Sequence, residues 1–133
     1  MAVNQFREPE EVARTPEQCV ATAADRTETT PVSGQGTVTY AASCAAVTVD
    51  VSGLPALPDD RTYQLWALSG EQAGQPTVAP RSMGLLPQAA TGQPQVVTEA
   101  TNPGEVAVAI TAEPAGGSAA PTVPIVWTAN LTS

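Results

Sequence analysis

Apolar and polar residues alternate with a period of two over several short segments of the chain. The clearest case is Val47–Val51, where three valines fall on one face and Thr48 and Asp50 on the other. This alternation predicts a half-buried β-strand, because successive side chains of a strand point to opposite faces. Further short strands are expected at residues 37–40, 62–68, 81–86, 95–98, 106–111 and 125–128.

Turn-forming residues separate these segments. Gly, Pro, Asn and Asp cluster at residues 53–60 and 102–104, and residues 70–80 read as a loop. Gly84 indicates a bulge in the strand that contains it, and residues 114–121 predict a long Gly/Ser/Ala connection between two strands. The pattern predicts an all-β fold, an antiparallel β-sandwich of about seven or eight short strands.

The N-terminal part of the chain has a different pattern. Residues 1–14 are polar and acidic, which indicates a stalk or linker. Thr15–Gln18 (TPEQ) is typical of a helix start, because threonine caps, proline suits the first helical position and glutamine completes a capping box. The helix is expected to be short, since residues 25–36 are polar and rich in turn formers. Residues 15–133 are expected to form a single domain.

Composition narrows the classes of function. The chain has 133 residues, a net charge of −8 and no histidine, and its five basic residues are all arginine. A protein that follows nucleic-acid phosphates needs a basic face, and an anionic membrane surface repels an acidic chain. Because histidine supplies much acid–base and metal chemistry, we expect no enzymatic activity, no metal and no cofactor. No run of apolar residues is long enough to span a membrane.

The two cysteines, Cys19 and Cys44, fit a disulfide formed in an oxidising compartment. The bridge would tie the N-terminal segment to the strand region by closing a loop of about 25 residues, which is worth about 3 kcal/mol in the chain-entropy picture. Two buried free thiols are the alternative.

The carboxylates offer little catalytic chemistry. Asp50, Glu99 and Glu113 lie in or beside predicted strands, and a pair of carboxylates can cleave a glycosidic bond. Sugar clefts are usually lined with aromatic side chains, however, and this chain has only five aromatic residues. This scarcity argues against a glycosidase site. Asp59–Asp60 belongs to a turn, and Ser118 follows two glycines with no activating group predicted nearby.

The large aromatic residues Tyr40, Tyr63, Trp66 and Trp127 are expected to anchor the core, because bulky side chains are otherwise scarce. An exposed pair of them that forms a ligand slot is the alternative.

Several segments resemble a known family when they are read in order. They are Gly53-Leu54-Pro55, Tyr63–Trp66 (YQLW), Ser82–Gly84, Glu113–Ser118 (EPAGGS) and Pro121-Thr122. Together they resemble the C-terminal extracytoplasmic domain of the anti-sigma-K factor (RskA-type) family of actinobacteria, over about residues 16–132. The residues expected in the core or in these motifs are Gly53, Leu54, Pro55, Tyr63, Leu65, Trp66, Glu113, Pro114, Gly116, Gly117 and Trp127.

The resemblance implies a membrane-anchored regulator. In that family a cytoplasmic domain holds an extracytoplasmic-function sigma factor inactive, one helix spans the membrane, and a β-rich domain lies outside. Regulated proteolysis then frees the sigma factor. This sequence corresponds to the outer domain alone, so sigma-factor binding is not expected from its residues, and residues 1–14 would be the juxtamembrane stalk.

Other partners and other classes of function stay open at this point. An envelope protease or an unknown ligand could contact the outer domain. A secreted or lipid-anchored cell-envelope module, binding a ligand at Trp66 or Trp127, is the alternative function, and a small hydrolase is a third.

Overall fold

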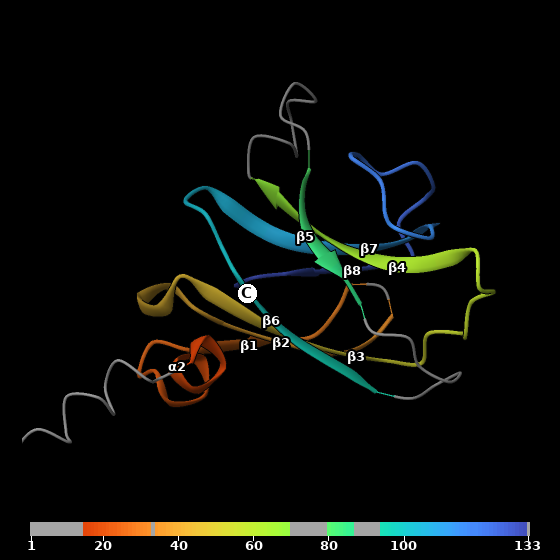
Figure 1. The fold of residues 1–133 in the computed structure, drawn as a ribbon. Helices are drawn as coiled ribbons and strands as arrows, with labels where there is room; N and C mark the ends of the chain where they lie inside the picture. Colours follow the sequence, from red (N-terminus) through yellow and green to blue (C-terminus); the bar gives the residue numbers. More distant parts are fainter. Residues whose placement is uncertain (1–14, 33, 70–79, 87–93, 133) are drawn as a thin grey trace, which may run out of the picture.

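The computed structural model describes residues 15–32, 34–69, 80–86 and 94–132. Within these residues eight strands form two stacked sheets, and the helix α2 (Pro16–Thr22) lies on the outer side of the first sheet (Figure 1). The predicted antiparallel β-sandwich with a short N-terminal helix is confirmed. The stalk expected at residues 1–14 and, except for Pro80, the loop expected at residues 70–80 lie outside the described residues.

The first sheet has the strand order β1–β2–β3–β6, and every neighbouring pair is antiparallel. Its strands are β1 (Thr27–Thr29), β2 (Gln35–Ala41), β3 (Ala46–Ser52) and β6 (Gln95–Ala100). The three valines of β3 face the core and Asp50 faces solvent, as the alternation predicts.

The second sheet has the order β5–β4–β7–β8 and is also antiparallel. Its strands are β4 (Arg61–Ser69), β5 (Arg81–Leu85), β7 (Glu105–Pro114) and β8 (Trp127–Asn130). The central position expected for residues 62–68 is confirmed, because β4 pairs with β5 on one side and β7 on the other.

The bulge expected at Gly84 is present between β4 and β5. Leu65 lies opposite Gly84 and Trp66 lies opposite Ser82, so Met83 is the extra residue. Met83 is buried in the core between the sheets. The bulge therefore turns an apolar side chain inward from an edge strand.

The core fills the space between the two sheets, mostly with valine from the first sheet and larger side chains from the second. Trp127 is fully buried at the start of β8, and its indole N–H donates to the Gln35 carbonyl at 3.0 Å. A Cβ atom at Gly34 would overlap the Trp127 ring, and the φ of +99° at this position also favours glycine.

Two sequence predictions about strands are wrong. The last strand was expected at residues 125–128, but Ile125 and Val126 are 48% and 43% exposed and β8 begins at Trp127. Their β-branched side chains favour a strand locally, yet the ladder of β8 pairs only with residues 107–110 of β7. The segment 25–36 was expected to be polar and rich in turns, with no strand in it, but it contains β1, an edge strand without apolar alternation.

No helix among the described residues is long and apolar enough to cross a membrane.

Candidate functional site

The helix α2 is built by local capping and then held by tertiary contacts. The Gln18 N–H donates to the Thr15 hydroxyl oxygen at 3.2 Å, and the Thr15 N–H donates to the Gln18 side-chain oxygen at 3.0 Å. This is the predicted capping box. A helix of seven residues is too short to be stable alone, so its position depends on its attachment to the sheet.

Two contacts attach α2 to the first sheet. Val20 is fully buried and packs with Ala41 and Ala46 of β2 and β3. Cys19 forms a disulfide with Cys44, with the Cα atoms 6.0 Å apart. The predicted bridge is therefore present, and it joins the helix to the 3-10 turn η2 (Ala42–Cys44).

A third contact fixes the chain just after the helix. The Ser43 N–H donates to one Asp25 carboxylate oxygen at 2.8 Å, and the Ser43 hydroxyl donates to the other at 2.7 Å. The hydrogen bonds from the Ser43 side chain and backbone lower the pKa of Asp25 below its ordinary value. We call α2, the Cys19–Cys44 disulfide and the Asp25–Ser43 pair the N-terminal clasp.

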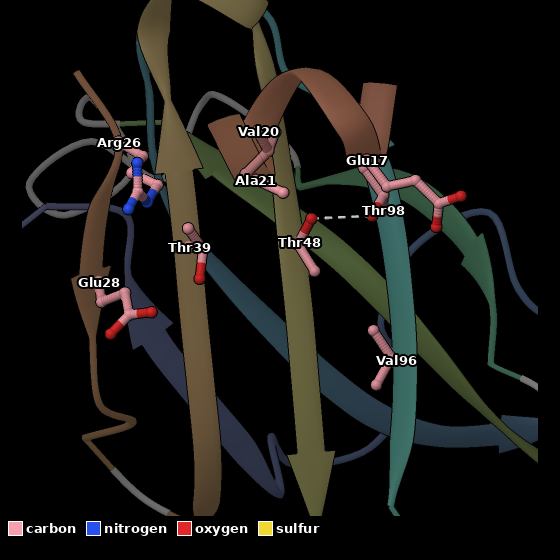
Figure 2. Close-up of a pocket in the computed structure, with 9 residues that line it drawn as sticks. All are labelled: Glu17, Val20, Ala21, Arg26, Glu28, Thr39, Thr48, Val96 and Thr98. Carbon is pink, nitrogen blue, oxygen red and sulfur yellow. Dashed lines mark hydrogen bonds between the residues drawn. The ribbon is translucent and has the colours of Figure 1, made fainter. Parts of the chain in front are cut away.

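A shallow hollow of about 400 Å³ lies between the clasp and the outer face of the first sheet (Figure 2). Val20 and Ala21 form its helical wall. The floor carries threonine side chains, and the Thr48 and Thr98 hydroxyls are 2.8 Å apart in one hydrogen bond. The remaining lining residues are Glu17, Arg26, Glu28, Thr39 and Val96. This lining of apolar, hydroxyl and charged side chains suits a contact surface better than a catalytic site.

A buried carboxylate lies on the outer face of the second sheet. Glu113 is completely buried, near the end of β7. Its carboxylate accepts hydrogen bonds from the hydroxyls of Thr111 (2.5 Å), Ser118 (2.9 Å) and Thr122 (2.5 Å), and from the Thr122 N–H (3.1 Å). Thr111 belongs to the same strand, whereas Ser118 and Thr122 belong to the connection between β7 and β8.

This environment favours the charged form of Glu113. Burial by itself raises the pKa of the carboxyl group, but the hydrogen bonds from Thr111, Thr122 and Ser118 outweigh it and lower the pKa to about 2. No activating group was expected beside Ser118, and the group that its hydroxyl contacts is the Glu113 carboxylate. A carboxylate with so low a pKa is a weak base, so its contact with Ser118 is structural in character.

Gln64 of β4 extends the network around Glu113. Its side-chain nitrogen donates to the Ser82 hydroxyl at 2.7 Å and to the Ser118 carbonyl at 3.0 Å, and its oxygen accepts from the Ser118 N–H at 2.9 Å. The Trp66 indole N–H donates to the Thr111 hydroxyl at 2.8 Å. Four of the quoted motifs, YQLW, the segment at Ser82, EPAGGS and Pro121-Thr122, thus meet in one hydrogen-bond network.

The remaining motif residues divide between the core and exposed positions. Tyr63 is buried, its hydroxyl donates to the Pro55 carbonyl at 2.7 Å, and burial raises the pKa of its phenol. Leu54 is half-buried against the core, whereas Gly53 and Pro55 are exposed. Of the other motif residues, Leu65 is in the core, Pro114 and Gly116 are exposed, and Gly117 (φ +86°) is half-buried against Gln64 and Leu85.

Comparison with known protein families identifies the family of the chain. The family model of the anti-sigma-K factor rskA C-terminal domain matches residues 1–125 of the chain. The chain belongs to this family. Comparisons with curated proteins and with solved structures find no match. In this rskA C-terminal domain, four of the motifs that carry the resemblance also form the hydrogen-bond network on the outer face of the second sheet.

The other candidate sites of the sequence are not assembled in this rskA C-terminal domain. Glu99 lies in the first sheet and Glu113 in the second, so the two do not form a pair across one cleft. Trp66 and Trp127 are both fully buried, which contradicts a ligand slot built from them. Within the described ranges, no three Cys, Asp or Glu side chains gather as a metal site would require.

Sequence reasoning found the motifs but missed the roles of their polar members. Gln64 interrupts an apolar central strand and Thr111 ends a predicted one, and both are buried. A polar residue in such a position needs a hydrogen-bond partner, and this is the signal that could have indicated a network. The Asp25–Ser43 pair left no comparable signal, because both residues are exposed.

Proposed function

We propose that the chain is the extracytoplasmic regulatory domain of a membrane-anchored anti-sigma factor, acting without enzymatic activity. Membership of the anti-sigma-K factor family supplies the sigma factor as the partner of the full protein. Contact with that sigma factor belongs to a different, cytoplasmic domain. The described domain controls an extracytoplasmic-function sigma factor indirectly, by governing proteolysis of the polypeptide that leads to the membrane.

The observation that carries this proposal is the N-terminal clasp. The chain enters the fold through α2, and the Cys19–Cys44 disulfide holds this helix against η2. A protease acts on locally opened backbone, so its access depends on how often such a segment detaches. With the clasp closed, residues 16–22 are helical and Val20 stays buried. A partner, ligand or redox change that opens the clasp would therefore lengthen the cleavable segment.

The disulfide also supports a location outside the cytoplasm. Structural disulfides persist in oxidising compartments and are rare where glutathione and thioredoxin keep thiols reduced. In an oxidising envelope the Cys19–Cys44 bond would be permanent unless a thiol reagent or an oxidoreductase reached it. The clasp would then report the redox condition of the envelope.

The state of Glu113 supports a role without catalysis. Each of its carboxylate oxygens is already occupied by hydroxyl or N–H donors of the same chain. A general acid or base must exchange protons with a substrate near neutral pH, and a pKa of about 2 is unsuited to that. Glu113 instead fixes the connection between β7 and β8.

The test uses the full-length protein in its own cells, with alkaline phosphatase fused after residue 132 and a reporter gene driven by the cognate sigma factor. An active fusion is expected, since that enzyme requires an oxidising compartment. The double variant Cys19→Ser/Cys44→Ser is expected to raise reporter output. Asp59→Asn/Asp60→Asn, in an exposed turn, is the matched control and should leave it unchanged. An inactive fusion, or equal output from the cysteine variant and the control, would contradict the proposal.

A further inference from the structure

The open edge of β6 is an unused hydrogen-bonding surface. β6 is the last strand of the first sheet and, among the described strands, pairs only with β3. The Thr101 N–H donates to the Ala45 carbonyl at 2.9 Å, in continuation of the β3–β6 ladder. Because main-chain bonds alternate along an antiparallel ladder, the odd-numbered residues 95–99 point their main-chain groups toward β3. The even-numbered residues point theirs to the open side.

A contact from β5 agrees with this assignment. Arg81, which is paired with Glu105, also donates to the Ala100 carbonyl at 3.0 Å. The Ala100 carbonyl therefore faces the open side and is already occupied. Within the part of the chain that the structure describes, the main-chain N–H and C=O groups of Val96 and Thr98 have no partner on that side.

The side chains along this edge do little to prevent pairing. Edge strands are normally protected by charges, prolines or bulges. Residues 95–98 (QVVT) are uncharged, and Val96 is 57% exposed. Pro94 stands before the segment and Glu99 after it, so the unprotected stretch is about the length of a short strand.

We infer that this edge pairs with the same edge of a second copy, antiparallel and with the two-fold axis at Val97. Val96 then exchanges both main-chain hydrogen bonds with Thr98 of the other copy, and the symmetric pair does the same. Val97 meets its own counterpart, and Gln95 lies opposite Glu99. Among the paired strand residues no like charges lie opposite each other, and the pairing is self-complementary as a two-fold dimer requires.

Neighbouring registers fit less well. An axis at Thr98 would pair Val96 with Ala100, whose carbonyl is already taken by Arg81. An axis at Val96 would place Pro94, which has no N–H, opposite Thr98. An odd shift would match a group that points outward with one that points toward β3. The axis at Val97 alone uses every open group of Val96 and Thr98.

The helix α2 approaches this edge from the outer face of the first sheet, because Thr15, Pro16 and Glu17 line a hollow of about 320 Å³ together with residues 96–99. α2 packs over one end of the strands, where Val20 contacts Ala46 opposite Ala100. Because a two-fold axis at Val97 keeps the outer faces of both copies on the same side, the pairing brings the first turns of the two α2 helices, each with Glu17, toward each other. A net charge of −8 on each copy opposes association, so the dimer should be weak and should strengthen with added salt.

Sedimentation velocity over a range of protein concentrations tests the pairing, which does not depend on the proposed function. The wild-type chain is expected to show a monomer–dimer equilibrium. Val96→Pro removes an N–H that only the second copy uses, so it should weaken association at least about tenfold. Val96→Thr keeps the N–H and should still dimerise. A wild-type chain that stays monomeric at the highest concentration, or a Val96→Pro variant that dimerises like wild type, would overturn the inference.

Cross-linking tests the register separately. Val97→Cys places two thiols opposite each other in a non-hydrogen-bonded pair, where Cα atoms are about 4.5 Å apart and within disulfide range. Mild oxidation should give a covalent dimer of this variant and far less of Thr98→Cys. The reverse preference, or no covalent dimer from either variant, would contradict an axis at Val97.

Discussion

The side chain of Gln64 pairs with the main chain of Ser118 as an adjacent strand would. Its nitrogen donates to the Ser118 carbonyl at 3.0 Å and its oxygen accepts the Ser118 N–H at 2.9 Å. The two residues are 54 positions apart, and the contact holds the connection between β7 and β8 against the outer face of the second sheet. Trp66 and Glu113 are both completely buried on that face.

Replacing Gln64 with glutamate tests this contact with little change in shape. The introduced carboxylate could not donate to the Ser118 carbonyl or the Ser82 hydroxyl, and the half-buried Ser118 carbonyl would be left without its partner. We expect Gln64→Glu to lower the free energy of unfolding by about 1–3 kcal/mol, measured by urea denaturation. Hydrogen exchange should accelerate at residues 115–126 and stay unchanged in β2. Gln35→Glu, at an exposed position, adds the same charge and should shift stability by less than about 0.5 kcal/mol.

Glu113→Gln tests whether the carboxylate organises the same connection. The amide nitrogen would face the donor hydroxyls and the Thr122 N–H, and the N–H cannot turn to become an acceptor. We expect a loss of about 2–4 kcal/mol, in the range for breaking a buried hydrogen-bond network. Thermal unfolding of Glu113→Gln beside Glu99→Gln, a half-buried carboxylate of the first sheet, makes the comparison. Equal losses in the two variants would contradict the special role of Glu113.

The same carboxylate predicts how stability varies with pH. In the folded chain the pKa of Glu113 is about 2, below its ordinary value of 4.5, so the unfolded chain takes up the proton first on acidification. The stabilisation is fully present above about pH 4.5 and is lost as the pH falls toward 2. Urea midpoints measured across this window should fall steeply for wild type. Glu113→Gln should show a shallower fall, and parallel curves would contradict the assignment.

The sequence predicted the elements whose cause is local. The valine alternation of β3, the capping box at Thr15 and the bulge at Gly84 each depend on neighbours in the chain, and all three are confirmed. The extent of β7 could not be predicted in the same way. It was expected to end at Thr111, but it continues to Pro114 because Glu113 and Pro114 pair with Thr62 and Arg61 of β4, about 50 residues earlier in the chain.

The candidate sites also differ in whether they could be predicted from the sequence. The Cys19–Cys44 disulfide could be predicted from the cysteine count, since two cysteines within one chain can pair in a single way. The link from Asp25 to Ser43 and the outward main-chain groups of β6 could not. They depend on which strands become neighbours and on the register between them, and local hydrophobic periodicity predicts neither.

Two of the positive-φ glycines, Gly34 and Gly104, provide a matched test of core packing. A Cβ at Gly34 would overlap the Trp127 ring, whereas a Cβ at Gly104 would meet open space. Both alanine variants bear the cost of a left-handed backbone, about 1–2 kcal/mol. Gly34→Ala should lose a further amount of about 1–3 kcal/mol from overpacking. Urea denaturation of the two variants measures the difference, and equal stabilities would contradict the tight approach of Gly34 to Trp127.

Control of the N-terminal entry by the Cys19–Cys44 disulfide is tested most directly by limited proteolysis of the folded chain, oxidised and reduced, with cut sites read by intact mass. The clasp predicts that reduction opens new cuts within residues 15–24 while both sheets stay intact. Cys19→Ser/Cys44→Ser should reproduce that pattern without reductant. Identical cut sites and rates in the oxidised and reduced chains would contradict the clasp as the element that governs protease access.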